Sequence, residues 1–436
     1  MFWIQFAVVL AAIVIGARIG GIGLGVMGGV GLAILTFGFG LEPTSPPIDV
    51  MLMIVAVITA AGALQASGGM DYLIGLAEKI LRKNPQRITF MAPVVTYFFT
   101  FFAGTGHVAY TLLPVISEVA QESKVRPERP MSIAVIASQQ AITASPISAA
   151  TVALVALLAP FDITLFQILA VTIPATFTAI MISAFAIRKR GAELEDDPEY
   201  QKRVKEGLRP AAVRENTAEV TTVSKLSVWL FLTAAMLIVV LGSIPELRPS
   251  FAVDGEMEPL SMPYTIQIIM LTVAAVIILA GKVNVNKLAE GSVFRAGIVA
   301  VVAIFGIAWM GDTFFQANMD QIEPAVQGMV ETAPWIFAFA LFFMSIFLNS
   351  QAATVSALMP LAVGLGINPL FLIAMFPAVN GYFFIPNYGP LIAAINFDRT
   401  GTTKIGNYVF NHSFMIPGLI AIISAVALGF AFTALF

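Results

Sequence analysis

Most of the chain consists of continuous apolar segments of about 15 to 25 residues, and short polar stretches separate them. A helix of about 20 apolar residues spans the ~30 Å hydrocarbon core of a bilayer. Strands of a membrane β-barrel would alternate apolar and polar positions, and these segments do not. The pattern therefore predicts an all-α polytopic membrane protein. The segments expected to cross the membrane are 2–17, 22–41, 50–67, 131–158, 164–187, 227–244, 264–281, 294–312, 369–395 and 411–435.

Two further apolar stretches, 88–120 and 333–366, are interrupted in the middle by small and polar residues, which is typical of re-entrant hairpins. The longest polar stretch, 188–226, is expected to be a cytoplasmic linker with a short amphipathic helix. It separates two halves, 1–187 and 227–436, that show the same order of five crossings and one hairpin. Because five is odd, the second half starts from the opposite side, so the two halves are predicted to be inverted repeats.

Faint sequence symmetry accompanies this order. GTGHVAYTLLP (104–114) and SQAATVSALMP (350–360) occupy corresponding places in the two hairpins. TASPISAATVAL (143–154) and FIPNYGPLIAAI (384–395) each put a Pro inside a predicted crossing. Proline removes a backbone hydrogen bond and ends or kinks a helix. We therefore expect broken helices near 143–150 and 384–391.

Unwound backbone at membrane depth is tolerated only where it lines a cavity or is buried in protein. Inverted repeats with interrupted helices recur in secondary transporters, whose substrate sites lie at the repeat interface. The sequence thus favours a transporter with a polar cavity at mid-depth.

The composition excludes a soluble enzyme of two or three domains. Hydrophobic residues make up 58% of the 436 residues and charged residues only 11%, against about 25% in a soluble domain. The absence of Cys excludes disulfides, thiolate metal sites and cysteine catalysis. No GxSxG or HExxH motif is present, so no enzyme activity, cofactor, bound metal or nucleic-acid partner is expected. The Gly-rich segment 20–31 contains a GxGxxG pattern, but within an apolar span it predicts close helix packing rather than nucleotide binding.

The charges that remain indicate the orientation. With the predicted crossings and hairpins, 22 of the 23 Lys and Arg residues fall on one side and only Arg248 falls on the other. The positive-inside rule makes the basic side cytoplasmic and places both termini in the periplasm.

Hydroxyl, amide and small residues gather at the four interruptions, where no Lys or Arg is found. Neutral donors together with helix N-termini suit a small anion that must bind and then leave. A hydrogen-bonded structural role is an alternative for His107. The candidate substrate-binding residues are Gly104, Thr105, Gly106, His107, Thr143, Ser145, Pro146, Ser148, Asn349, Ser350, Gln351, Thr354, Pro386, Asn387 and Tyr388.

Four charged residues are weaker candidates. Arg82, Lys83 and Arg126 flank the first hairpin and could attract dianions to an inner vestibule, although positive-inside anchoring also explains them. Asp398 is expected at a cytoplasmic helix end.

At these motifs the chain resembles the anaerobic C4-dicarboxylate transporter (Dcu) family. GTGHVAYTLLP (104–114) and RPSF (248–251) look closer to its DcuB-like branch than to its DcuA-like branch, whose members are similar throughout. The matching strings cover nearly the whole chain in order and are specific only when taken together. They are GARIGGIGLG (16–25), QASGGMDYL (65–73), EKILRKNPQRI (78–88), FAGTGHVAYTLLPVI (102–116), RPERPMS (126–132), ITASPISAA (142–150), FRAGIVAVVAIFGIAWMGDTF (294–314), NSQAAT (349–354), FDRTGTTKIG (397–406) and FNHSFMIPG (410–418).

This resemblance implies transport of fumarate, succinate, malate and aspartate, with fumarate/succinate antiport in anaerobic metabolism. It also implies a bacterial inner-membrane protein, a sensor histidine kinase as a partner, and a regulatory role for Asp398 as the alternative to a helix-end position. It further implies kinship with the ion transporter superfamily, whose dicarboxylate members are elevator-type homodimers. An anion channel or a transporter of another small carboxylate is the alternative. The coupling ion and the direction of transport stay open.

Overall fold

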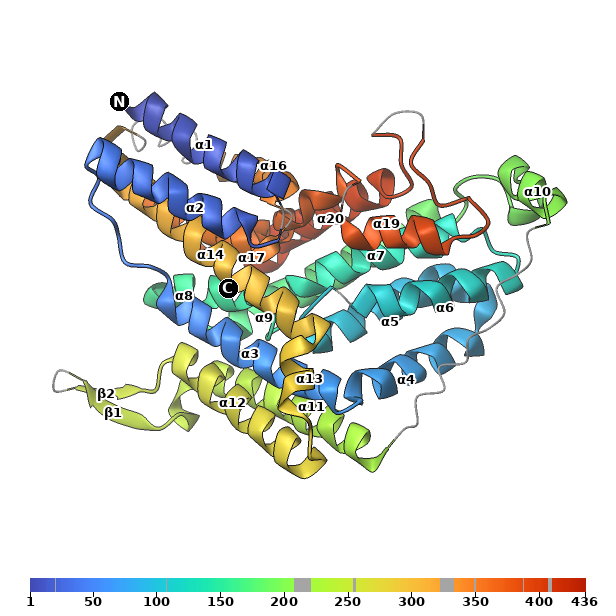
Figure 1. Ribbon diagram of the computed structural model, residues 1–436, viewed down its shortest axis with the longest axis horizontal. Helices are drawn as coiled ribbons and strands as arrows, with labels where there is room; N and C mark the ends of the chain where they lie inside the picture. The colour runs from blue at the N-terminus through green and yellow to red at the C-terminus, as the bar shows by residue number, and fades with distance from the viewer. Residues whose placement is uncertain are drawn as a thin grey trace.

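The computed structural model describes residues 1–19, 21–106, 108–207, 221–253, 256–321, 333–348, 350–386, 388–406 and 410–436. Figure 1 shows a helical protein in which a two-stranded β-hairpin lies at the end of the long axis opposite helix α10. By length and composition, six of the described helices could cross a membrane. The prediction of a helical, polytopic membrane protein is therefore confirmed.

The first part of the chain alternates long helices with paired shorter ones. Helix α4, which follows α3 after a turn at Gly68, is amphipathic and was not expected from the sequence. The helices before the linker are α1 (Phe2–Ile19), α2 (Gly23–Ala33) with a π-helical turn (Ile34–Gly38), α3 (Ile48–Ala66), α4 (Gly69–Lys83), α5 (Ile88–Ala103), α6 (Val108–Glu122), α7 (Glu128–Ile142), α8 (Ala149–Leu158) and α9 (Leu165–Ile187).

The segment after α9 contains the short helix α10 (Pro198–Lys205), which begins where the Asp197 carboxylate accepts hydrogen bonds from Glu199 N and Tyr200 N. The later elements are α11 (Thr222–Ser243), β1 (Ser250–Val253), β2 (Glu256–Pro259), α12 (Met262–Gly281), α13 (Val285–Glu290), α14 (Ser292–Ala317), α16 (Phe337–Leu348), α17 (Gln351–Gly364), α18 (Pro369–Met375), the 3-10 helix η7 (Phe376–Phe383), α19 (Gly389–Phe397) and α20 (Met415–Thr433).

Two groups of helices pack side by side. We call α1, α2, α3, α11, α12 and α14 the frame, and α5–α9 together with α16–α20 the hairpin unit. Within the hairpin unit α7 is central, because α5, α6, α9, α19 and α20 all pack against it. The groups meet where α14 contacts α17 and where α3 contacts α8.

The frame depends on close contact between α2 and α14. A Cβ atom on Gly25 would lie 1.9 Å from the carbonyl oxygen of Val302, and one on Gly306 would lie 1.8 Å from the carbonyl oxygen of Gly25. A Cβ atom on Gly28 would lie 2.4 Å from the carbonyl carbon of Gly306. The predicted packing role of the Gly-rich segment is confirmed at Gly25 and Gly28, since only glycine lets the two backbones approach this closely.

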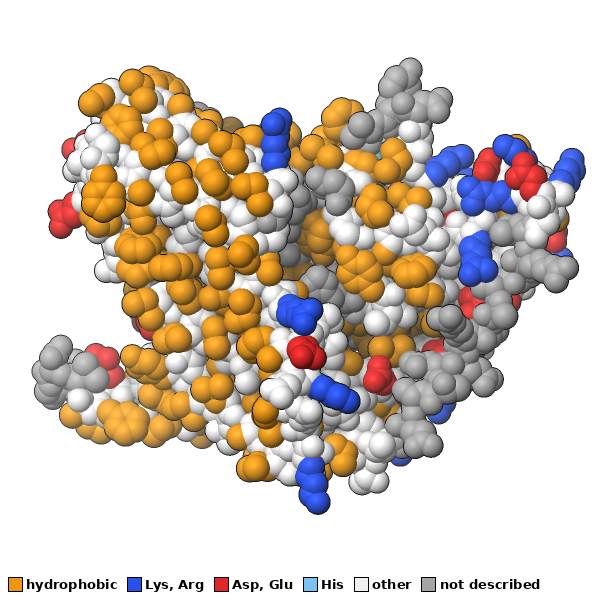
Figure 2. All heavy atoms as spheres, in the orientation of Figure 1, with side chains coloured by type: hydrophobic (Ala, Val, Ile, Leu, Met, Phe, Trp, Pro, Cys, Tyr) orange, Lys and Arg blue, Asp and Glu red, His pale blue; other side chains and the backbone are white. Residues whose placement is uncertain are grey.

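The surface divides along the long axis. Figure 2 shows hydrophobic side chains over most of the visible frame, while Lys and Arg side chains gather around α10 and near α13. Acidic side chains appear at the opposite end, near the β-hairpin, and also among the Lys and Arg side chains around α10 and near α13. An apolar belt between charged ends is the surface that a bilayer requires.

We expect Gly306→Ala to destabilise the frame, because the new methyl group would meet backbone atoms of α2 that cannot move aside separately from the helix. Overpacking of this kind costs about 1–3 kcal/mol. Thermal unfolding in detergent should show a clearly lower midpoint for Gly306→Ala.

Gly29→Ala is the matched control, since nothing lies within 4 Å of a Cβ atom at Gly29. Its melting temperature should be unchanged or slightly higher, because Ala favours helix. Equal melting temperatures for the two variants would refute the close-contact account.

Candidate functional site

Four interruptions of helical structure lie in the hairpin unit. Helix α5 ends at Gly104, whose φ of 68° is in the left-handed region that glycine adopts without strain. The segment 143–148 separates α7 from α8 and contains Pro146, while 384–388 separates η7 from α19 and contains Pro386. The fourth interruption precedes Ser350, which caps α17.

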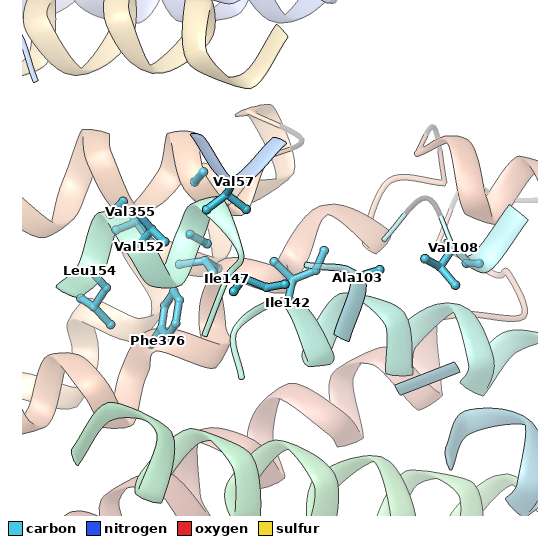
Figure 3. Packing of buried hydrophobic residues seen from close by; sticks show 14 of the residues in the cluster. Val57, Ala103, Val108, Ile142, Ile147, Val152, Leu154, Val355 and Phe376 are labelled. Carbon is cyan, nitrogen blue, oxygen red and sulfur yellow. The ribbon is translucent and has the colours of Figure 1, made fainter. Parts of the chain in front are cut away.

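These interruptions surround one cavity of about 370 Å³, a size typical of ligand pockets. From the hairpin unit it is lined at Gly104, Thr105 and Gly106, at Ile142 and Ile147, at Ser350 and Gln351, and at Tyr388. From the frame, α2, α3 and α14 close it. Figure 3 shows part of this wall, with Val57 of α3 lying next to Ile147 and Val152 of the hairpin unit.

The cavity is neutral and mostly apolar. None of its described lining residues is Asp, Glu, Lys or Arg. Its polar side chains are Thr105, Ser350, Gln351 and Tyr388, and much of the remaining wall is Ala, Val, Ile and Leu. Such a wall can enclose a short carbon chain while a few polar groups orient the ends.

Two helix N-termini open into this cavity. Ala149 and Ala150 are the first residues of α8, and Gln351 and Ala352 are the first residues of α17; all four line the cavity. The caps of these helices, Ser148 and Ser350, accept hydrogen bonds from the third helical N–H of each, so earlier N–H groups are left for a ligand. The positive ends of both helix dipoles therefore favour an anion here.

A buried hydrogen-bond network supports the cavity wall. Asn380 Nδ2 donates to the carbonyl of Pro377 (3.1 Å) and, at 3.4 Å, to Thr143 Oγ1. Gln351 Nε2 donates to Asn380 Oδ1 (3.1 Å) and to the Tyr382 hydroxyl. The network thus joins the end of α7 and η7 to the start of α17, and it reaches the cavity at Gln351.

The network lies next to a second tyrosine on the cavity wall. The rings of Tyr382 and Tyr388 pack edge to face, with ring centroids 4.5 Å apart. The four side chains that the network joins are all buried, so their polar groups fix one another's orientation. They belong to Thr143, Asn380, Gln351 and Tyr382.

The candidate residues fall into three groups. Those on the cavity wall are Gly104, Thr105, Gly106, Ser350, Gln351 and Tyr388. Those behind the wall are Thr143, Ser145, Pro146, Ser148, Thr354 and Pro386. His107, Asn349 and Asn387 lie outside the described residues.

The hydroxyls behind the wall bond to backbone. Ser145 donates to the carbonyl of Phe101 at 2.6 Å, which ties the first hairpin to the 143–148 segment. Ser148 donates to the carbonyl of Ile142, and Thr354 donates to that of Ser350. The Ser145 and Ser148 hydroxyls thus supply partners to carbonyl groups at the ends of α5 and α7, whereas the Ser350 carbonyl also accepts the helical N–H of Thr354.

Sequence reasoning missed Asn380, Tyr382, Gln139 and Gln140. The side chains of Gln139 and Gln140 are buried, and neither amide has a hydrogen-bond partner among the described residues. The available signal was their polarity, because an amide inside an apolar span is costly unless the fold uses it. Gln140 and Asn380 each stand six residues before the proline of a broken helix.

A second cavity of about 260 Å³ adjoins the first, since Val293 lines both. Its wall includes Gln65, Asp71, Thr111 and Ser292. The Gln65 side chain holds the start of α14, donating to Ser292 Oγ (2.8 Å) and accepting from Val293 N (3.2 Å). This second space extends the cavity along α4 and α6.

The charged candidates have protein partners, apart from Lys83, which is exposed at the end of α4 and pairs with none of the described residues. Arg82 pairs with Glu78 and Glu118, at 3.0 and 3.1 Å, and with Glu122.

The Asp398 carboxylate is buried and accepts hydrogen bonds from Thr402 Oγ1 and from the backbone N–H of Thr400 and Thr403. It thereby organises the turn after α19.

Arg126 lies in an ion cluster that fastens the segment after α9 to α7. Its guanidinium contacts Glu128 at 2.7 Å and Asp197 at 2.5 Å, and all three side chains are more than nine-tenths buried. Burial opposes ionisation of Asp197, but the N–H of Tyr200 and the Arg126 guanidinium outweigh it and lower the pKa of that carboxyl.

Comparison with known proteins gives one consistent result. The family pattern DcuA_DcuB, described as anaerobic C4-dicarboxylate membrane transporter, matches residues 1–436. The anaerobic C4-dicarboxylate transporter DcuB of Escherichia coli O6:H1 is 43% identical over 448 residues, covering 100% of this chain and 99% of the relative. The C4-dicarboxylate transporter DcuA of Wolinella succinogenes is 44% identical, covering 99% and 98%.

Among solved structures, MtrF of Neisseria gonorrhoeae, from a class of antimetabolite efflux pumps, matches with a TM-score of 0.55 at 13% identity. The match covers 92% of this chain and 84% of MtrF. At this identity the likeness concerns the fold.

The Arg126 cluster generates a prediction about stability. Arg126→Met leaves the buried Asp197 carboxylate without its cation and Glu128 with Arg190 alone, at 3.7 Å, which should cost about 3 kcal/mol of unfolding free energy at pH 7. Because the folded-state pKa of Asp197 is lowered, this difference is fully present above about pH 4 and shrinks as the pH falls further and the carboxyl is protonated. Thermal unfolding across that pH range measures it.

Lys124→Met serves as the control, since Lys124 and its partner Glu195 are 72% and 62% exposed. An exposed pair contributes only about 0–1 kcal/mol. Indistinguishable unfolding of the two variants at pH 7 would contradict the role given to Arg126.

Proposed function

The chain belongs to the family of anaerobic C4-dicarboxylate membrane transporters, and we propose that it is a secondary transporter exchanging fumarate, succinate, malate and aspartate, with fumarate/succinate antiport as its main reaction. The observation that supports this most strongly is the neutral cavity enclosed by the four helix interruptions. Its two helix N-termini offer places for the two carboxylates of one substrate.

In this proposal the carboxylates bind through N–H groups at the starts of α8 and α17 and through the hydroxyls of Thr105, Ser350 and Tyr388. The carbon chain lies against the apolar wall. Micromolar affinity corresponds to about 8 kcal/mol, which several charge-assisted hydrogen bonds of about 1.5–3 kcal/mol can supply after the cost of association. A site without fixed cations holds a dianion loosely enough to release it.

We further propose that the hairpin unit moves against the frame as an elevator and that the two halves are inverted repeats. Small residues of α14 face the cavity, among them Ala296, Gly297 and Ala300, and such residues offer a smooth surface for sliding. In this proposal the hairpin unit carries the substrate, and the substrate slides along α2, α3 and α14 of the frame when the unit moves.

The bacterial inner membrane, periplasmic termini and a homodimer remain predictions. The gathering of Lys and Arg at the α10 end supports a cytoplasmic position for that end. Contact with a sensor histidine kinase is likewise a prediction, as is the position of 188–226 as a cytoplasmic linker.

An anion channel is the alternative function. A channel would show flux that does not saturate at low substrate and is not stimulated by substrate on the opposite side. An exchanger must return its site loaded, so external substrate accelerates efflux.

Counterflow in proteoliposomes tests the proposed function. Vesicles loaded with succinate should accumulate labelled succinate, and external fumarate, malate or aspartate should compete. Absence of counterflow with all four acids would overturn the assignment, and non-saturating flux would favour the channel.

Tyr388→Phe tests the position of the site. The variant loses one hydroxyl on the cavity wall, and a hydrogen bond to a charged group is worth about 1.5–3 kcal/mol, so KM for succinate should rise roughly tenfold or more. Tyr72→Phe, on α4 and absent from the wall of either cavity, should keep the wild-type KM. A wild-type KM for succinate in Tyr388→Phe would contradict the placement of the substrate site at Tyr388.

A further inference from the structure

His412 is a buried histidine just before α20, and its two ring nitrogens have different partners. Nδ1 lies 3.2 Å from the backbone nitrogen of Phe414, whose N–H can only donate. Nε2 lies 3.2 Å from the carbonyl oxygen of Phe384, which can only accept. Both contacts require the same neutral ring, with its proton on Nε2. Because His412 is only 2% exposed, the ring is held as a donor directed at Phe384.

The Phe384 carbonyl belongs to the interruption between η7 and α19. Among the described residues, no backbone N–H donates to this carbonyl. A carbonyl that an interruption leaves without a helical partner needs another donor. The His412 ring supplies that donor from a part of the chain 28 positions away, so it fixes the first residue of the interruption.

The far end of the same interruption lies on the cavity wall, at Tyr388. The Tyr388 hydroxyl lies 3.3 Å from the point where a Cβ atom on Gly106, near the tip of the first hairpin, would stand. A Cβ atom on Gly389, the next residue, would lie 1.9 Å from the hydroxyl oxygen of Tyr110 on α6. Small shifts of the interruption therefore change how the Tyr388 hydroxyl lies against the first hairpin.

His412 is fastened to α7 rather than to α19. The next residue, Ser413, receives a backbone hydrogen bond partner in the carbonyl of Lys404, at 3.0 Å. Its hydroxyl donates to Glu128 Oε1 at 2.9 Å, and Glu128 belongs to the ion cluster of Arg126. The imidazole thus has a support that is independent of the interruption whose carbonyl it holds.

We propose that His412 is a positioning residue for the substrate site, whose Nε2–H holds the Phe384 carbonyl and thereby keeps Tyr388 in its place on the cavity wall. The inference rests on the proposed function. His412 is not part of the cavity wall and acts through the interruption. Without the hydrogen bond, the arrangement that binds substrate is populated less, and the apparent affinity falls by the same factor.

Two variants separate the two ring nitrogens. In His412→Asn the amide oxygen takes the place of Nδ1 and accepts from the Phe414 N–H, but no donor reaches Phe384. In His412→Gln the amide nitrogen takes the place of Nε2 and donates to Phe384, while the Phe414 N–H loses its partner.

Counterflow in proteoliposomes gives KM and the maximal rate for succinate in both variants. We expect KM to rise about tenfold in His412→Asn, because a lost neutral hydrogen bond corresponds to a factor of up to roughly ten. His412→Gln keeps the bond to Phe384, so its KM should stay within about twofold of the wild-type value, even if its melting temperature is lower. The maximal rate should change less than KM.

Ser183→Ala is the matched control. The Ser183 hydroxyl is also fully buried and donates to a backbone carbonyl, that of Pro417 in α20, at 2.8 Å. Ser183 lines neither cavity. The variant should lower the melting temperature in detergent and keep the wild-type KM, which separates the loss of any buried donor from the loss of the one that holds Phe384.

Ser413→Ala provides a second route if His412→Asn does not fold, because it removes the hydroxyl that ties the backbone beside His412 to Glu128. Its KM for succinate should rise several-fold, with the maximal rate nearly unchanged. A wild-type KM in the folded variant, or equal KM values for His412→Asn and His412→Gln, would overturn the positioning role and leave His412 a role in stability alone. A wild-type protein that exchanges no C4 acid is a different result, because it refutes the proposed function and the positioning role with it.

Discussion

The structure depends on one requirement, that backbone N–H and C=O groups inside a bilayer must have partners. An uninterrupted helix meets this requirement through its own backbone hydrogen bonds. The hairpin unit has four helix interruptions, and the backbone groups there need other partners. There the carbonyls are satisfied by buried hydroxyls, such as Ser145 on Phe101 and Ser148 on Ile142. The N–H groups at the starts of α8 and α17 face the cavity instead, where they are available to a ligand.

This arrangement explains how a site for an anion can exist without a cation. The charged residues lie outside the cavity, and near α10 the Arg126 side chain joins α7 to the segment before α10. The frame presents a firm wall because Gly25 and Gly306 bring α2 and α14 into backbone contact. The neutral cavity therefore lies between the frame and the hairpin unit, which pack against each other through small and apolar side chains.

The sequence predicts the features that depend on local chemistry. Long apolar segments give membrane helices, and prolines at 146 and 386 mark interruptions. Helix α4 was missed because the membrane helices were predicted from long continuous apolar segments. The charged residues of this amphipathic helix break up its apolar residues, so the segment resembles a polar loop.

The network could not be predicted in the same way. Asn380 meets Thr143 across 237 positions of the chain, and that contact exists only after η7 packs against α7. Six of the fifteen candidate residues line the cavity, because a hydroxyl near an interruption can serve either a ligand or the exposed backbone. Only tertiary packing decides between these two uses. The assignments at His107, Asn349 and Asn387 stay predictions.

Substrate-protected labelling tests the central claim, that the cavity between the hairpin unit and the frame is the substrate site. The chain has no Cys, so single cysteines at Ser350 and Ala300, on opposite walls, report without background. A maleimide should label both, and succinate should slow both reactions at concentrations near its KM, while a cysteine at the exposed Lys124 should react at the same rate with or without succinate. Labelling at Ser350 and Ala300 that is indifferent to every C4 acid exchanged by the same protein would contradict the account.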